Sequence, residues 1–259
     1  MNIPLYILAS GNWFTSMLYH VCKYGIPDMF DDQINIDELA EKLKLHKNSI
    51  YRIIRALSVV DIFRLDNHMI IHTPLSRQLR QDHKSTMKWF ILMRGSKSQY
   101  LAWQDISPSI ENGKSSFTST NGMNIFQYMD AHKDEASYFH KAMGTISKSI
   151  SPQLKQILCG INTDSSTVCD IGGGNGELIY QSTLGTNMVP ILFDTKEVVD
   201  LSPYPIQKVH GTFFVEEEIP CASIYIMKYI LHDWSDKKCI EILSNIKNRM
   251  SKKFETNSY

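Results

Sequence analysis

Residues 168–177, VCDIGGGNGE, combine residue types that could bind a charged cofactor. An apolar run ends on Asp170 and opens into a glycine-rich turn. Because Gly172, Gly174 and Gly176 have no Cβ, the backbone can turn tightly and a ligand can approach the main chain. The spacing G-x-G-x-G differs from the G-x-G-x-x-G of dinucleotide sites. Two interpretations stay open: a plain strand-to-helix turn, or a site for a cofactor that carries a cation.

Two further polar residues each follow an apolar segment that we expect to be a strand. Val189 to Phe193 ends on Asp194, about twenty residues beyond the glycines, where an acid could accept hydrogen bonds from both hydroxyls of a ribose. Ser223 to Leu231 ends on His232, and an imidazole with an ordinary pKa of about 6.5 could take a proton from a hydroxyl near neutral pH. The alternatives are a capping or surface acid and a core or capping histidine.

The elements that must position these residues read as a doubly wound α/β sheet. In such a sheet, the carboxyl ends of parallel strands meet at one edge, so Asp170, Asp194 and His232 would lie together. A last helix is predicted by apolar residues at helical spacing, which are Cys239, Ile240, Leu243, Ile246 and Met250.

The segment before residue 85 has the pattern of a winged helix. Ile36, Leu39 and Leu43 mark a short helix, and Phe63 to His72 reads as a β-wing that turns at residues 66–67. Between them we expect a second helix, capped by Asn48 or Ser49, with apolar positions at Ile50, Ile53, Ile54 and Leu57. A Ser/Thr/Gly-rich loop is expected at residues 113–122.

This module could bind DNA or a second copy of the chain. Lys47, Arg52 and Arg55 on the second helix could contact phosphates. Nearby acids oppose that interpretation, namely Asp31, Asp32, Asp37, Glu38 and Glu41. Upstream, the uncharged run from Pro4 to Tyr19 is predicted as a buried helix, and its apolar residues favour a homodimer.

Composition excludes several classes of partner. The chain has 259 residues, with 27 basic and 27 acidic side chains and a formal net charge of zero, so no global charge attracts nucleic acid or an anionic membrane. Five scattered cysteines have no C-x-x-C spacing, so we expect neither a disulfide framework nor a metal site. We therefore expect reduced thiols, a cytoplasmic location and no membrane-spanning segment.

Extended segments of the chain resemble the S-adenosylmethionine-dependent O-methyltransferases of the caffeate and hydroxyindole type. They are VCDIGGGNGE, ILFD at 191–194, MKYILHDWSD at 227–236 and AWQDISPSIENGKSSF at 102–117. The resemblance implies an α/β, Rossmann-like class I methyltransferase domain preceded by an α-helical winged-helix dimerisation domain. The expected domains are residues 1–84, for dimerisation, and 85–259, for linking helices and the methyltransferase. It implies a homodimer that does not bind DNA.

The resemblance also implies roles for individual residues. S-adenosylmethionine is the cofactor and a small hydroxylated aromatic molecule is the substrate, with His232 as the general base. Phe139 and Met143 would line the acceptor pocket, with ordinary helix core as the alternative. The residues implied to bind the cofactor are Gly172 and Gly174 at its methionine part, Asp194 at its ribose, and Thr212 and Lys228 near its adenine, together with Asp170 and Phe213.

The chain departs from the family pattern in two places. Where the family has the word GDFF, Thr212 replaces the acid, so we expect weaker cofactor binding. Family members also continue beyond HDWSD with three strands and with acids that orient the histidine, whereas this chain ends at Tyr259 after the polar run SKKFETNSY. We therefore expect a truncated chain with an incomplete sheet. The alternative to an active enzyme is a dimerising relative with weak or no turnover, or a winged-helix regulator.

Overall fold

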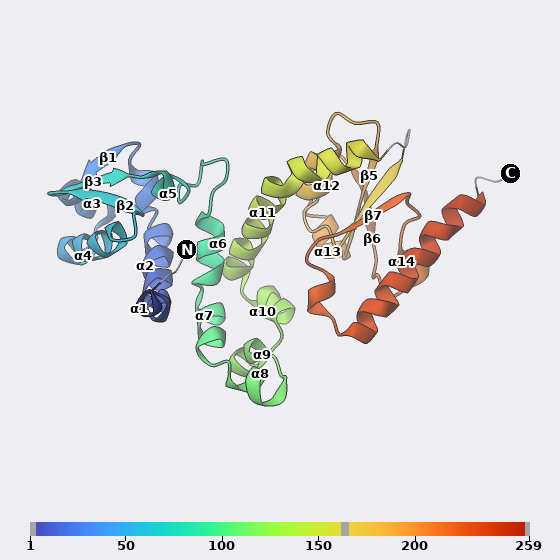
Figure 1. Cartoon of the computed structure of the whole chain (residues 1–259), viewed down its shortest axis with the longest axis horizontal. Coiled ribbons are helices and arrows are strands. Elements are labelled where there is room, and N and C mark those ends of the chain that lie inside the picture. Colours follow the sequence, from blue (N-terminus) through green and yellow to red (C-terminus); the bar gives the residue numbers. More distant parts are fainter. Residues whose placement is uncertain (1–3, 162–165, 257–259) are drawn as a thin grey trace. The chain divides into compact units, whose positions relative to one another are not determined.

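The computed structural model describes residues 4–161 and 166–256 of the chain. The chain divides into two compact units, Met1–Thr145 and Ile146–Tyr259, and each is described by itself (Figure 1). The predicted boundary at residues 84 and 85 falls inside the first unit, because the helices that follow it pack within that unit. The functional division into domains 1–84 and 85–259 stays a prediction.

The first unit begins with the winged-helix elements. They are α1 (Leu5–Ala9), α2 (Gly11–Lys23), η1 (Ile26–Met29), β1 (Gln33–Asn35), α3 (Ile36–Leu43), α4 (Lys47–Ser58), β2 (Phe63–Asp66), β3 (Met69–His72) and α5 (Pro74–Arg77). The strands form an antiparallel sheet in the order β1-β3-β2, with Phe63 opposite His72. The expected wing is confirmed, and Asn67 turns it with a φ of 52°.

Helices α3 and α4 form where the apolar spacing predicts them. The Asn35 side chain caps α3 by accepting a hydrogen bond from the Asp37 amide at 2.8 Å. Helix α4 buries Ile50, Ile54 and Leu57. The expected cap at Asn48 or Ser49 is wrong: α4 begins at Lys47, so both residues lie in its first turn.

The rest of the first unit is helical. It contains α6 (Lys88–Arg94), α7 (Lys97–Gln104), α8 (Ser107–Asn112), α9 (Ser116–Asn121), α10 (Ile125–Ala131) and the first part of α11 (Lys133–Gly160). The loop expected at residues 113–122 is wrong in part, because α9 forms within it. The Ser115 side chain caps α9 by accepting from the Thr118 amide, and Gly122 ends it with a φ of 74°.

The amino-terminal run is not the buried helix that its uncharged sequence predicts. It forms two short helices, and α1 buries no residue. Leu5 is 81% exposed, Tyr6 is 70% exposed and Trp13 is 66% exposed. These three side chains therefore lack a cover among the described residues, whereas Phe14 and Leu18 pack against the core of the unit. The exposed side chains are the observation that bears on dimerisation.

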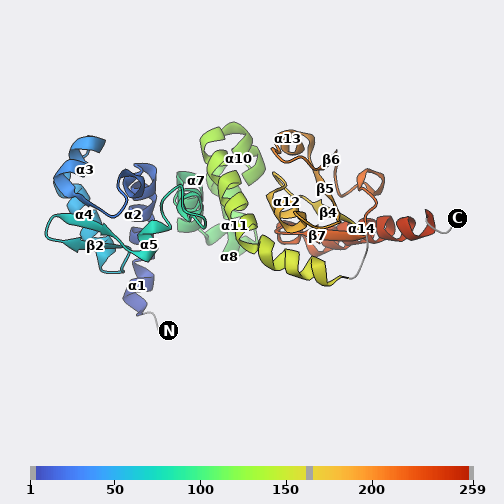
Figure 2. The ribbon, with the colours of Figure 1, turned by 90° about the horizontal axis from the view of Figure 1, so that it is seen from above.

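The second unit contains a fully parallel sheet. Its strands are β4 (Thr167–Ile171), β5 (Val189–Asp194), β6 (Gln207–His210) and β7 (Ile224–Met227), in the order β6-β5-β4-β7 (Figures 1 and 2). The connecting and flanking elements are α12 (Glu177–Thr183), α13 (Lys196–Val199), η2 (Glu216–Glu218), η3 (Leu231–Asp233) and α14 (Asp236–Thr256). This topology confirms the predicted α/β fold class.

The side chains of the sheet alternate between two cores, as a pleated strand requires. On one face, Val168 packs with Leu158 of α11 and Ile179 of α12. On the other face, Cys169 and Ile171 pack with Phe193, Ile219 and residues of α14. The ends of four parallel strands are thereby held in fixed register at one edge.

Two expectations for the end of the chain need correction. The strand predicted over residues 223–231 ends at Met227, because Tyr229 has a φ of 60° and turns the backbone away from the sheet. Of the residues that predict α14, Ile246 is buried and Cys239 and Met250 are half-buried, whereas Ile240 and Leu243 are exposed. The predicted face is therefore wrong in part, since Ile242 packs in the core in place of Ile240 and Leu243.

We expect the stability of the chain to depend on the protonation of His72. Its ring is buried, stacks on Phe30 with 4.2 Å between ring centroids, and places Nε2 3.1 Å from the Pro27 carbonyl oxygen. Burial lowers the pKa of His72 below its ordinary value. As the pH falls through about 6.5, the unfolded chain takes up a proton at this position that the folded chain resists. The contribution of His72 to the free energy of unfolding should therefore decrease, whereas Asp170, whose pKa is raised to about 7, contributes a change of the opposite sign.

Urea unfolding of the wild type and of His72→Gln at pH 7.5 and pH 5.5 measures this contribution as the difference between their pH dependences. On acidification, His72→Gln should lose less stability, or gain more, than the wild type does. His20→Gln, at an exposed position of α2, should follow the wild type. An equal pH dependence of His72→Gln and the wild type would contradict the assignment.

Candidate functional site

The candidate site lies where the parallel strands end. In the register of the sheet, Ile171 stands opposite both Phe193 and Met227, and Asp194 stands opposite His210. The glycine-rich turn follows β4, Asp194 ends β5, Thr212 follows β6 and Lys228 follows β7. The carboxyl edge of one sheet thus carries every cofactor-binding residue that the sequence predicts.

The three glycines of the turn have left-handed backbone conformations, with φ of 65° at Gly172, 62° at Gly174 and 82° at Gly176. Their surroundings differ. A Cβ on Gly174 would meet no atom within 4 Å, whereas a Cβ on Gly172 would lie 2.3 Å from Ile230 Cδ1. The open approach expected at all three positions is therefore present at Gly174, while at Gly172 the space is taken by Ile230.

Asp170 is a buried acid beneath this turn. It is 1% exposed, and its Oδ2 has no hydrogen-bond partner among residues 4–161 and 166–256. The pKa of Asp170 is raised to about 7, chiefly by burial; the charge of Lys228 lowers it and that of Asp194 raises it. A buried carboxyl group with an unpaired oxygen is costly unless a cation approaches it.

Asp194 joins the ends of two strands. Its Oδ2 accepts a hydrogen bond from the Gly174 amide at 2.9 Å, and its Oδ1 accepts one from the Thr195 amide at 2.7 Å. The carboxylate is half-buried, so it is held in one orientation at the edge of the sheet. A carboxylate oriented in this way can accept further hydrogen bonds from hydroxyl groups of a ligand.

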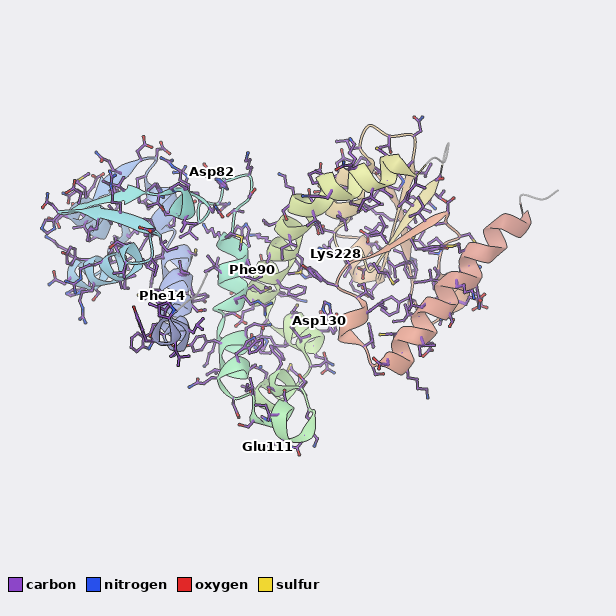
Figure 3. All side chains as sticks on the ribbon, in the orientation of Figure 1. Phe14, Asp82, Phe90, Glu111, Asp130 and Lys228 are labelled. Atoms are coloured by element: carbon purple, nitrogen blue, oxygen red, sulfur yellow. The ribbon has the colours of Figure 1, made fainter. Side chains whose placement is uncertain are left out.

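Lys228 follows β7, at the carboxyl edge of the sheet (Figure 3). Its Nζ donates to Ser147 Oγ of α11 at 2.6 Å, and burial lowers the pKa of Lys228 while Asp170 raises it. Lys228 follows β7, and Thr212 follows β6, with β5 and β4 between them. Neighbouring strands are about 4.8 Å apart, so the two residues approach the site from different strands of the sheet. The expected place of Lys228 near the adenine stays a prediction.

Thr212 and Phe213 are held by local contacts. The Thr212 amide donates to Glu218 Oε2 at 2.7 Å, and Thr212 Oγ1 accepts from the Phe214 amide at 3.3 Å. The Phe213 ring packs edge-on against Trp234, with 5.8 Å between centroids. The Thr212 hydroxyl thus stabilises its own turn, and its expected contact with adenine stays a prediction.

His232 lies in η3, directly after the end of the β7 segment. Its side chain is 60% exposed, and its Nε2 lies 3.2 Å from Asp233 Oδ1. Burial raises the pKa of Asp233, and His232 lowers it. The resemblance implies that acids from a later part of family members orient this histidine, and it gives Asp233 no such role. The dipeptide His232-Asp233 was the available signal, but only the turn of η3 brings the two side chains together.

Phe139 and Met143 lie one helical turn apart on α11, in the first unit. Both are half-buried. Phe139 borders a small cavity together with Tyr128 and Glu135, where Ser98 and Tyr128 both donate hydrogen bonds to the Glu135 carboxylate. Their expected place in an acceptor pocket stays a prediction.

The described ranges contain neither a cluster of metal-ligating side chains nor a membrane-spanning helix. No group of three or more His, Cys, Asp or Glu side chains within residues 4–161 and 166–256 could hold a metal ion. No helix in those ranges is long and apolar enough to cross a bilayer.

Comparison with known proteins identifies the family. Residues 103–253, more than half of the chain, match the O-methyltransferase domain. The chain belongs to this family. It is an S-adenosylmethionine-dependent O-methyltransferase, and that cofactor fits the unpaired oxygen of Asp170 and the open face of Gly174.

Curated relatives include other O-methyltransferases. Phenazine O-methyltransferase PhzM of Lysobacter antibioticus is 29% identical over 256 residues, which cover 94% of this chain and 74% of that protein. Tabersonine 16-O-methyltransferase of Catharanthus roseus is 29% identical over 253 residues, which cover 89% of this chain and 70% of that protein.

Solved structures support the fold. LaPhzM superposes with a TM-score of 0.83 at 28% identity and covers 95% of this chain and 78% of its own. Human N-acetylserotonin methyltransferase, solved in complex with SAM, has a TM-score of 0.83 at 20% identity and covers 95% of this chain and 75% of its own. At that identity, the human enzyme supports the fold alone.

Replacing Asp194 should weaken cofactor binding. Asp194→Ala removes a carboxylate that can accept from two ribose hydroxyls, and it should reduce the affinity for S-adenosylmethionine by about 2–3 kcal/mol, roughly 30-fold to 150-fold. Isothermal titration calorimetry measures this change. Asp194→Asn keeps the size of the side chain and should lose a smaller part of the affinity.

The control is Asp200→Ala, which removes an exposed acid paired with Lys196 a few residues away. It should bind the cofactor as tightly as the wild type. Equal affinity of Asp194→Ala and the wild type would show that this carboxylate does not hold the ribose.

Proposed function

We propose that this enzyme transfers the methyl group of S-adenosylmethionine to a hydroxyl of a small aromatic molecule. The observation that carries the proposal is His232 with Asp233, in the turn that follows the strand beside the glycine-rich loop. An exposed imidazole with an acid at 3.2 Å can take a proton from a phenol near neutral pH. The names of the relatives above, which act on a phenazine and on tabersonine, support an aromatic substrate.

Two acids would bind different parts of the cofactor. When bound, S-adenosylmethionine supplies an electrophilic methyl group on a sulfonium sulfur. Asp194 would hold the ribose hydroxyls, and the open face at Gly174 would let the cofactor lie against the main chain. Asp170 would place a negative charge under the cationic methionine end, with Gly172 lining the same end. Thr212 and Phe213 would border the adenine.

The proton would pass to His232. Since its Nε2 faces Asp233 Oδ1, the free acceptor is Nδ1 when the neutral ring carries its proton on Nε2. Asp233 would hold this tautomer and face the imidazolium that forms. Phe139 and Met143 would provide the apolar wall against which the aromatic substrate lies.

His232→Ala should lower kcat for methyl transfer by about 10²-fold to 10⁴-fold, because the general base is lost. The affinity for S-adenosylmethionine should stay within about twofold, since His232 makes no proposed contact with the cofactor. Transfer of a radiolabelled methyl group across a panel of phenols, hydroxyindoles and hydroxyphenazines measures kcat, and calorimetry measures the affinity.

His20→Ala, on the exposed face of α2, is the control and should keep full activity. Asp233→Asn should lower kcat less than His232→Ala does. Activity that survives His232→Ala would remove this histidine as the base, and the absence of methyl transfer by the wild type to every acceptor on the panel would argue against the proposed substrate class.

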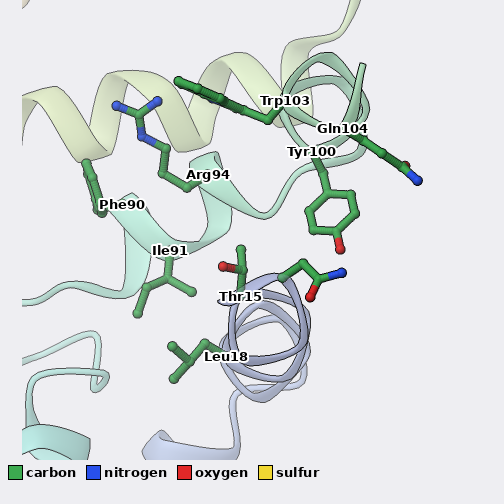
Figure 4. A pocket seen from close by; sticks show the side chains of 9 residues that line it. Thr15, Leu18, Phe90, Ile91, Arg94, Tyr100, Trp103 and Gln104 are labelled. Atoms are coloured by element: carbon green, nitrogen blue, oxygen red, sulfur yellow. The ribbon is translucent and has the colours of Figure 1, made fainter. Parts of the chain in front are cut away.

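We also propose that the enzyme is a homodimer joined through its amino-terminal helices. A cavity of about 620 Å³ lies among α2, α6 and α7, and Thr15, Ile91 and Trp103 are among its lining residues (Figure 4). Leu5, Tyr6 and Trp13 are exposed on the same unit. An apolar surface of this kind on a folded unit is typical of an interface.

Light scattering should give about twice the chain mass of 29.8 kDa. Leu5→Asp with Trp103→Asp should shift the chain toward the monomer, because both exchange exposed apolar contact area for charge. Val59→Asp, at a 77% exposed apolar position after α4, is the control and should leave the mass unchanged. A monomeric wild type would contradict the proposal.

Two features bear on the remaining alternatives. Lys47 pairs with Asp37 at 2.5 Å, and the Arg55 guanidinium lies over the Tyr51 ring, so the helix expected to contact DNA phosphates has part of its charge engaged.

All five cysteines are free thiols. Unpaired thiols support the proposal that the protein resides in a reducing compartment such as the cytoplasm.

A further inference from the structure

The half-buried Lys228 and the buried Asp170 lie at the ends of the neighbouring strands β7 and β4 without forming a hydrogen bond to each other. Asp170 Oδ2 has no partner in the part of the chain that the structure describes. Lys228, whose charge acts on Asp170, donates its hydrogen bond to Ser147 Oγ at 2.6 Å. Opposite charges in a poorly solvated site attract strongly, so this separation requires a cause.

Ser147 supplies that cause. It is a buried residue of α11, within the second unit. Its hydroxyl oxygen accepts a hydrogen bond of 2.6 Å from the Lys228 ammonium. An ammonium bonded to a neutral hydroxyl keeps its full charge, and Asp170 keeps an unpaired oxygen. Without the hydroxyl, the flexible lysine side chain could turn to the carboxylate and neutralise it.

The amino-acid end of S-adenosylmethionine carries an ammonium and a carboxylate. This end is therefore complementary to an acid and a lysine that are kept apart, and it is not complementary to an acid and a lysine that neutralise each other. Asp170 is 1% exposed and lies under Gly173, where a Cβ would come within 2.9 Å of its Oδ2. It would act on the ligand ammonium by its charge, across the glycine turn.

We propose that Ser147 is a positioning residue that holds Lys228 away from Asp170, so that the two charges receive the zwitterionic amino-acid end of the cofactor. This inference rests on the proposed placement of the cofactor at the edge of the sheet. Two other titratable groups lie near Asp170. The Asp194 carboxylate accepts hydrogen bonds from the Gly174 and Thr195 amides, and Cys169 is a buried thiol whose pKa is raised by burial.

The test compares ligands with and without the amino-acid end. S-adenosylhomocysteine carries it, whereas 5′-methylthioadenosine has the same adenosine and thioether but lacks it. In calorimetric titrations of the full chain, Ser147→Ala should bind S-adenosylhomocysteine about tenfold more weakly, the loss expected for a charge-assisted contact. Binding of 5′-methylthioadenosine should stay within about twofold, which also shows that the variant is folded.

Two further variants separate positioning from packing. Ser147→Thr keeps the hydroxyl and should bind S-adenosylhomocysteine as the wild type does. In a Lys228→Met background no ammonium can turn to Asp170, so adding Ser147→Ala should cause no further loss. Ser147→Cys, a weaker acceptor, should give an intermediate loss if Ser147→Ala does not fold.

A change in proton release gives a second readout. Binding of a cation to the wild type should release protons from Asp170 near pH 7, and Ser147→Ala should release fewer, because Lys228 would already hold Asp170 ionised. Calorimetry in buffers of different ionisation enthalpy measures this release.

Unchanged affinity of Ser147→Ala for S-adenosylhomocysteine, or an equal loss for 5′-methylthioadenosine, would overturn the inference. So would an additive loss in the Lys228→Met background. If the wild type binds neither ligand, the proposed function fails at its first step, and that outcome is distinct from a failure confined to the Ser147 variants.

Discussion

The hydrogen bond between the Gly174 amide and the Asp194 carboxylate is the contact on which the site depends. It joins the turn after β4 to the end of β5, two segments twenty residues apart in the chain. The bond requires the left-handed backbone at Gly174, which a glycine adopts without the cost that a side chain would add. Because the turn and the acid are fixed to each other, the open face of Gly174 lies beside an oriented carboxylate. A ligand can therefore contact the main chain of the turn and place its ribose hydroxyls on Asp194 at the same time.

The electrostatics of the second unit follow from what lies beneath that turn. A carboxyl group at the end of a buried parallel strand loses its hydration, and the raised pKa of Asp170 measures the cost. Natural cores satisfy nearly all buried polar atoms, so the unpaired Oδ2 is an exception that a functional site explains. The contact of Lys228 with Ser147 belongs to the same arrangement, since it leaves a compensating cation near the acid without cancelling its charge.

The first unit leaves apolar side chains exposed. Its winged-helix core is well packed, with Ile36, Ile54 and Leu57 fully buried. Helix α1, by contrast, buries none of its apolar side chains, because it has only five residues. An apolar run without charges can lower its exposed area by packing on a second molecule, and the cavity among α2, α6 and α7 offers a surface for such packing.

The sequence by itself determined the parts of this protein that rest on local patterns. Period-two and period-3.6 spacing predicted the wing and α3, the apolar runs predicted β4 and β5, and the glycines and Asp194 marked the turn and the acid that the structure joins. Resemblance over long segments supplied the family, because those segments combine several rare features at fixed distances.

Only the tertiary structure decided the rest. The order of the strands separates Lys228 from Thr212, and no local pattern encodes which strands are neighbours. The packed face of α14 depends on the sheet it covers, so Ile240 and Leu243 are exposed despite their spacing. The unpaired oxygen of Asp170 and the contact of Lys228 with Ser147 arise from contacts between segments that are far apart in the chain. The approach of Asp233 to His232 arises from the turn of η3. Residue types fix which charges are present, whereas burial and neighbours fix what those charges can do.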